Sequence, residues 1–265
     1  MAVVSPLTRA DGVLLKRDDL LHPDIPGNKW RKLKYNLTGE PIVTFGGAYS
    51  NHIRAVAAAG REFGFPTGGV IRGEPVRNEV LDFAVACGMR LIFLDRARYR
   101  AKTSPEVLRL VREEFPGHRV LPEGGSNAEA VRGCMEIGPE LAHLGEAVVC
   151  CPVGTGGTLA GLAAGLPPGF TAVGFSVLKG GSFLYDEVAR LQTEALGHVT
   201  PNWRVETGFH FGGYARTTPE LSAFIGDFET RHGLRLDHVY TAKMMYGIRA
   251  LGLGPTVVAV ITGRV

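Results

Sequence analysis

The chain has 265 residues, of which 45% are hydrophobic and 21% are charged. This balance is typical of a globular protein with a sizeable core and excludes a disordered chain. The net charge is only +3, and the sequence contains no basic run that could follow a phosphate backbone, so nucleic acid is not an expected partner.

Short apolar runs alternate with stretches of helical period along the chain. The runs predict strands over residues 12–16, 41–45, 68–72, 90–94, 119–121, 147–153, 171–176 and 256–261. The stretches between them predict helices over residues 51–63, 79–87, 105–115, 128–144, 157–166, 183–196, 219–232 and 242–251. Such alternation is typical of right-handed βαβ units and predicts an α/β fold with mostly parallel sheets.

The connections between these elements are short, so any domain boundary must lie within one of them. We place the two domain boundaries near Gly39 and Gly138. Residues 1–39 together with 139–265 would then form a larger domain, and residues 40–138 a smaller one. Ligands of open α/β sheets lie beyond the carboxyl ends of the strands, so the turns that follow the strands are the candidate sites.

Glycine is unusually frequent, with 36 residues, nearly twice the usual share of about 7%. Residues 154–158 read Gly-Thr-Gly-Gly-Thr between an expected strand and an expected helix. Free N–H groups at a helix start, with two threonine hydroxyls, suit a phosphate. The loop is not a P-loop, because no Gly-Lys-Ser/Thr follows. It also fits a dinucleotide-binding loop poorly, because the next strand does not end in the acidic residue that would contact the ribose. The alternative is a tight turn with a capping threonine.

Two further glycine-rich turns, residues 46–52 and 123–127, also follow expected strands. In the first, Ser50 and Asn51 suit an N-cap, and capping alone would explain both. As a ligand site, the turn would offer N–H groups to a carboxylate, and Asn51 could hydrogen-bond a phenolic oxygen.

A single lysine stands at another glycine-led turn, Gly27-Asn28-Lys29, directly before an expected helix. The positive end of the helix dipole, burial and nearby cations all lower the pKa of a lysine in such a place. A lysine of this kind can form an imine with a carbonyl compound. The alternative is that Lys29, Lys32 and Lys34 belong to an ordinary solvated helix.

Taken together, these turns resemble the pyridoxal-phosphate (PLP) enzymes of the tryptophan synthase β-like superfamily, fold type II. Within it, the chain is most similar to the family of 1-aminocyclopropane-1-carboxylate (ACC) deaminase and D-cysteine desulfhydrase. The resemblance rests, in the family's order, on residues 14–20, 27–37, 46–60, 121–127, 154–161, 210–216 and 239–248. It implies a two-domain, three-layer αβα fold with mostly parallel sheets and PLP in the larger domain.

The resemblance also implies a role for individual residues. Lys29 would hold PLP as a Schiff base, Asn51 would contact its O3′, and Thr262 would contact the pyridine nitrogen. The phosphate would be held by Thr155, Gly156, Gly157 and Thr158. The implied catalytic residues are Lys29, Ser50, Tyr214 and Tyr240. No metal is expected, because no cysteine or histidine spacing suggests one.

The activity implied by the resemblance is a lyase or deaminase that converts a small amino acid to a 2-oxo acid and ammonia. The substrate would be ACC or resemble D-cysteine, and Thr241, which stands where ACC deaminases carry an acidic residue, favours the desulfhydrase pattern. The alternatives are a PLP or amino-acid binding protein without turnover and a dinucleotide oxidoreductase. The resemblance also implies a homodimer. We expect it in the cytoplasm, because no segment suggests export or membrane spanning.

Overall fold

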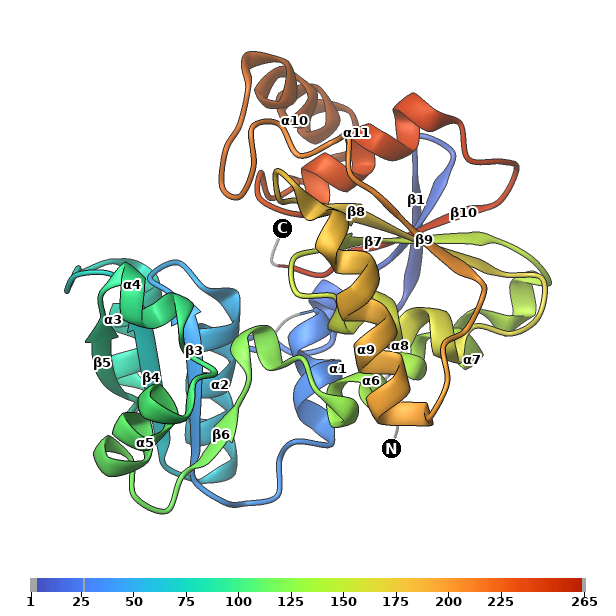
Figure 1. Ribbon diagram of the computed structural model, residues 1–265. Coiled ribbons are helices and arrows are strands. Elements are labelled where there is room, and N and C mark those ends of the chain that lie inside the picture. Colours follow the sequence, from blue (N-terminus) through green and yellow to red (C-terminus); the bar gives the residue numbers. More distant parts are fainter. Residues whose placement is uncertain (1–3, 26, 264–265) are drawn as a thin grey trace. The chain divides into compact units, whose positions relative to one another are not determined.

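The computed structural model describes residues 4–25 and 27–263 (Figure 1). Their internal contacts divide the chain into two units. Unit 1 contains the described residues up to Tyr35 and from Ser126 onward, and unit 2 is Asn36–Gly125. The chain thus passes between the two units earlier than the expected boundaries near Gly39 and Gly138. The placement of the cofactor in the larger domain stays a prediction.

Unit 1 is built on a six-stranded sheet with the strand order β1-β2-β10-β7-β8-β9. The strands are β1 (Leu7–Ala10), β2 (Val13–Lys16), β7 (Val148–Val153), β8 (Thr171–Ser176), β9 (Trp203–Glu206) and β10 (Val257–Val260). All neighbours pair in parallel except β1 and β2, which are antiparallel. The central strand β7 is buried along nearly all its length, as its continuous apolar sequence requires when helices cover both faces.

Helices lie on both faces of this sheet (Figure 1). They are α1 (Asn28–Lys34), α6 (Ala128–Met135), α7 (Ile137–Leu141), α8 (Gly157–Gly165), α9 (Leu184–Leu196), α10 (Pro219–His232) and α11 (Thr241–Leu251). One core joins Val149 to Leu159 of α8 and Val188 of α9. A second core joins Val173 to helices α10 and α11. Unit 1 therefore has three layers, with helices above and below the sheet.

Unit 2 has a smaller, wholly parallel sheet with the order β5-β4-β3-β6. Its strands are β3 (Ile42–Gly47), β4 (Thr67–Arg72), β5 (Arg90–Leu94) and β6 (Arg119–Leu121). Its helices are α2 (Asn51–Phe63), α3 (Glu79–Ala86), α4 (Arg96–Arg100) and α5 (Pro105–Glu114). A side-chain cap fixes where each of these four helices begins, because its oxygen accepts hydrogen bonds from backbone N–H groups of the first turn. The capping residues of α2, α3, α4 and α5 are, in this order, Ser50, Asn78, Asp95 and Ser104.

The structure departs from the expected elements in four places. The helix expected over residues 128–144 is divided into α6, α7 and a 3₁₀ turn over Ala142–Leu144. The strands β1 and β9 were not expected, nor was the short helix α4. In residues 4–25 and 27–263, no helix is both long and apolar enough to cross a membrane.

Candidate active site

The carboxyl ends of β7 and β10 carry two of the sequence features singled out above. The glycine-rich loop follows β7 directly, and Thr262 lies two residues beyond the end of the neighbouring strand β10. Gly27 adopts a φ of 66°, and a Cβ atom there would lie 1.9 Å from the carbonyl oxygen of Thr262. Only glycine permits this approach. It places the start of α1 beside Thr262, at the edge of the sheet where α/β proteins bind ligands.

Lys29 lies in the first turn of α1 and is half-buried. Burial, reinforced by the positive charge of Lys32, lowers the pKa of Lys29 from 10.5 to about 7. A large share of Lys29 is therefore the neutral amine near neutral pH. The neutral amine is the form that attacks a carbonyl carbon.

The loop before α8 forms a concave cradle close to α1. Gly156 has a φ of 77°, and a Cβ atom on Gly157 would lie 2.7 Å from Ser126 Oγ and 3.1 Å from Lys32 Nζ. The hydroxyls of Ser126 and Thr155 lie 2.7 Å apart. Glycine at position 157 thus lets the hydroxyl of Ser126 and the amine of Lys32 lie against the loop. We call these residues, 154–158 with Lys32 and Ser126, the phosphate cradle.

Asn28 ties the lysine-bearing helix to this cradle. Its Nδ2 donates a hydrogen bond of 2.7 Å to Thr158 Oγ1 at the start of α8. Both side chains are buried. The bond fixes the first turn of α1, which carries Lys29, against the loop that follows β7.

The sequence analysis missed Lys32 as a member of the site. Lys32 is only 2% exposed, its Nζ donates to Ser126 Oγ at 3.0 Å, and burial lowers its pKa. The solvated-helix alternative is therefore wrong for Lys32, although Lys34 does remain partly exposed and pairs with Glu136. The i,i+3 spacing from Lys29, which puts both lysines on one side of α1, is the signal that could have found it.

Tyr240 and Tyr214 meet near the same loop. The ring of Tyr240 lies over Gly154, with its Cε1 3.5 Å from where a Cβ atom on that glycine would be. The two hydroxyls are 3.4 Å apart, and the rings meet edge to face with centroids 6.1 Å apart. The structure thus brings these two predicted residues together within unit 1.

Two charged side chains hold the segments that carry the tyrosines. Lys243 Nζ donates to the carbonyl oxygens of His210 at 2.9 Å and Gly213 at 2.7 Å, and burial lowers the pKa of Lys243 to about 8. The carboxylate of Asp237 accepts from the backbone N–H of Tyr240 at 2.7 Å. Lys243 and Asp237 therefore position Tyr214 and Tyr240, respectively.

Ser50 and Asn51 lie in unit 2, at the start of α2. Ser50 Oγ accepts from the backbone N–H groups of His52 and Ile53 at 3.2 and 3.3 Å, so the capping role is present. Its hydroxyl hydrogen remains able to donate, and the side chain of Asn51 is exposed. The approach of these two residues to Lys29 of unit 1 stays a prediction.

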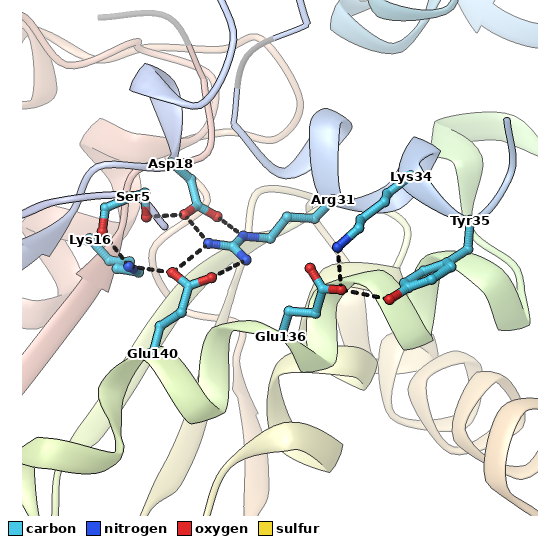
Figure 2. Close-up of polar contacts among 8 residues, drawn as sticks. All are labelled: Ser5, Lys16, Asp18, Arg31, Lys34, Tyr35, Glu136 and Glu140. Atoms are coloured by element: carbon cyan, nitrogen blue, oxygen red, sulfur yellow. Dashed lines mark hydrogen bonds and ion pairs between the residues drawn. The ribbon is translucent and has the colours of Figure 1, made fainter. Parts of the chain in front are cut away.

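A buried ionic network fixes the other side of α1. Figure 2 shows Arg31 between two carboxylates: its Nε lies 2.7 Å from Asp18 Oδ2, and its Nη1 lies 2.8 Å from Glu140 Oε1. Lys16 Nζ adds a second cation 2.5 Å from Glu140 Oε2. Burial alone would raise the pKa of Glu140, but the hydrogen bonds from Arg31 and Lys16 lower it. Glu140 therefore remains ionised at neutral pH and joins α1 to α7.

A family model described as pyridoxal-phosphate dependent enzyme matches residues 3–263. The chain belongs to this family. It is 31% identical to the "Putative 1-aminocyclopropane-1-carboxylate deaminase" of Pyrococcus furiosus, over 99% of this chain and 87% of that protein. It is 29% identical to the mitochondrial bifunctional D-cysteine desulfhydrase/1-aminocyclopropane-1-carboxylate deaminase of Arabidopsis thaliana, over 88% of this chain and 66% of that protein.

Among solved structures, the crystal structure of an ACC deaminase homologue superposes with a TM-score of 0.84 at 26% identity, and the alignment covers 100% of this chain and 91% of that one. The resemblance found in the sequence motifs and the expected α/β fold with parallel sheets, fold type II, are thus confirmed. The dinucleotide alternative is wrong, because the matching family uses pyridoxal phosphate.

The residues of this PLP-dependent enzyme fit the cofactor. The phosphate cradle pairs a helix N-terminus and hydroxyl donors with a buried lysine, which is a donor set for a dianion. Glycine at position 157 allows Ser126 Oγ and Lys32 Nζ to lie against the loop, where a side chain would collide with them. The nearby amine of Lys29, with its low pKa, suits the aldehyde of the cofactor.

Proposed function

We propose that this enzyme is a lyase that converts a small amino acid, D-cysteine or ACC, to a 2-oxo acid and ammonia. The relatives named above carry these activities in their names. The single observation that carries the proposal is Lys29, whose pKa of about 7 makes it both a nucleophile and a base beside the phosphate cradle. We further propose a cytoplasmic homodimer.

When bound, PLP supplies an electron sink for the bonds at the substrate's α carbon. Three groups of this chain would orient it. The phosphate would lie on Thr155, Gly156, Gly157 and Thr158, with Lys32 neutralising its charge. Thr262, beside Gly27, would contact the pyridine nitrogen, and Asn51 the O3′ oxygen.

Lys29, Ser50 and the two tyrosines would act on the substrate. Neutral Lys29 Nζ would take the proton from the α carbon of D-cysteine, and the hydroxyl of Ser50 would donate to the substrate carboxylate. Tyr240 and Tyr214, whose hydroxyls face each other, would hold a proton near the departing sulfur. ACC carries no hydrogen on the carbon that bears its amino group, so Lys29 cannot begin that reaction by the same proton transfer.

D-cysteine is the substrate that we favour. Position 241, where ACC deaminases carry an acid, is a threonine, and its hydroxyl donates to Asp237 Oδ2 at 2.6 Å. Thr241 is fully buried in this contact. It therefore offers no acidic group to a substrate.

Incubation with each substrate tests the proposed function. We expect the purified protein with added PLP to release ammonia and a 2-oxo acid from D-cysteine, with a lower kcat/KM for ACC. Both products are measured by coupled assays, with L-cysteine as the comparison for stereochemistry. Tight binding of PLP without ammonia from either substrate would contradict the proposal and favour the binding protein.

Lys32 provides a separate test of the phosphate cradle. Lys32→Met should raise the Kd for PLP by about tenfold to a hundredfold, because a hydrogen bond from a charged donor contributes about 1.5–3 kcal/mol. Titration of the cofactor-free protein, followed by absorbance, measures this. Lys34→Met, on the exposed side of α1, is the control and should leave the Kd unchanged. An unchanged Kd in Lys32→Met would remove Lys32 from the cradle.

A further inference from the structure

A cavity in unit 2 lies beside the turn of residues 46–52. It has a volume of about 420 Å³ and is lined by residues 47–49, Arg72, Gly73, Glu74 and Arg96. A volume of this size lies within the range for small-molecule sites, which is about 300–1,000 Å³. The residues come from the carboxyl ends of three neighbouring parallel strands: Gly47 ends β3, Arg72 ends β4, and Arg96 follows β5. This is the edge at which open α/β sheets bind ligands.

The backbone around the cavity is fixed by hydrogen bonds. Gly47 and Arg72 are register partners, and the N–H of Gly73 donates to the carbonyl oxygen of Leu94 at 2.7 Å. Asn78 Nδ2 donates to the carbonyl oxygen of Ala48 at 3.2 Å, which joins the turn after β3 to the segment after β4. The backbone that carries the lining residues is therefore held by the sheet and its neighbouring turns.

The charges of the cavity favour an anion. Its lining residues include two arginines, Arg72 and Arg96, and one acidic residue, Glu74. In the described part of the chain, neither Arg72 nor Arg96 forms an ion pair, and Arg72 contacts only the ring of Tyr99, at 5.9 Å from the centroid. The Arg72 Nη2 atom lies 3.7 Å from where a Cβ atom on Gly47 would be. The guanidinium thus lies over the bare backbone of the turn that leads to Ser50.

The geometry points to a binding site for the carboxylate of a small molecule, held by Arg72 and Arg96. The turn of residues 47–49 forms one wall, and Ser50 is the next residue along the chain. A molecule with two acidic groups can therefore engage Ser50 with one and the arginines with the other. An amino acid with an acidic side chain would be a further ligand of the active site beside D-cysteine, and its contact with Ser50 rests on the proposed function, whereas a dicarboxylate effector needs only the cavity.

Binding of aspartate and asparagine tests the site, because the two differ in the charge of one group. Calorimetry on the protein with PLP bound, with both enantiomers of each, should show aspartate binding about tenfold or more tightly than asparagine. Arg72→Met/Arg96→Met should bring this ratio close to one. Arg98→Met is the matched control. Arg98 lies in α4 like Arg96, but it is exposed, pairs with Asp95 and does not line the cavity. It should keep the ratio of the unmodified protein.

Succinate, which has no amino group, separates the two sources of the carboxylate. An effector site should bind succinate with the same dependence on the arginines, whereas a subsite for the acidic side chain of an amino acid held at Ser50 should bind aspartate alone. Equal binding of aspartate and asparagine, or a ratio that the double variant leaves unchanged, would overturn the proposal. Calorimetry measures binding and not turnover, so a failure to turn over D-cysteine would contradict the proposed function without affecting the carboxylate site. Turnover of D-cysteine without tighter binding of aspartate would contradict the carboxylate site alone.

Discussion

Replacing Lys29 with alanine should lower kcat for ammonia release from D-cysteine by at least about 10²–10⁴-fold, the usual contribution of one positioned acid or base. It should also remove the covalent link to PLP. Borohydride treatment of the unmodified protein should leave the cofactor on the peptide that contains Lys29, as mass mapping would show. Lys34→Ala, on the exposed side of α1, serves as the control. A reduced cofactor found on Lys32 instead would contradict our assignment.

The rate at which Lys29 captures PLP should increase with pH. Lys29 has a pKa of about 7 in the folded protein against an ordinary value of 10.5, so it loses its proton at a much lower pH. The rate at which the cofactor-free protein captures PLP should therefore rise through pH 7 and then level off. A rise that continues toward pH 10 would show that Lys29 is not buried as described.

The same shift acts on stability. Between about pH 7 and 10.5 the unfolded chain binds more protons at Lys29 than the folded chain does, so the free energy of unfolding should increase with pH in this range. Lys29→Met should flatten this increase. Urea unfolding of the cofactor-free protein at several pH values provides the measurement.

The sequence predicted the central strands of both sheets and failed at the margins of the larger one. Strands such as β7 and β8 are buried along most of their length, so their sequences are continuous apolar runs. The two missed strands, β1 and β9, are the two edges of the six-stranded sheet. An edge strand pairs on one side only, and polar residues such as the exposed Thr8 and the half-exposed Arg204 leave no apolar run to detect.

The expected helix over residues 128–144 failed for a different reason. A Cβ atom on Gly138 would lie 1.8 Å from the carbonyl oxygen of Gly165, at the end of α8. The short helix α7, which follows the break at Glu136, thus lies against the end of α8. Such a contact depends on a residue far away in the chain, and helical periodicity alone cannot show it.

The site divides in the same way. Lys29, the loop after β7 and the cap of α2 are local patterns, because a turn and the helix after it are neighbours in sequence. Lys32 and Ser126, which are 94 residues apart, are joined only by the fold. Arg31 was not among the residues singled out in the sequence, yet it is only 2% exposed.

Asp18→Ala should lower the free energy of unfolding by about 3–5 kcal/mol, because removing one partner leaves a buried charge uncompensated. Asp18 is fully buried and accepts two hydrogen bonds from Arg31, at 2.7 and 2.8 Å (Figure 2). Lys34→Ala, which breaks the more exposed pair with Glu136, should cost less than about 1 kcal/mol. Urea unfolding of the cofactor-free variants measures both.

A double variant separates the loss of the ion pair from the loss of packing. Asp18→Ala/Arg31→Met removes both charges, so its cost should be smaller than the sum of the two single changes. If Asp18→Ala cost no more than Lys34→Ala, the network would not hold α1 in place. Because α1 also carries Lys29, the destabilised Asp18→Ala should capture PLP more weakly even where it remains folded. In this variant, the hydrogen bond from Asn28 to Thr158 would be the main contact that still holds Lys29 beside the phosphate cradle.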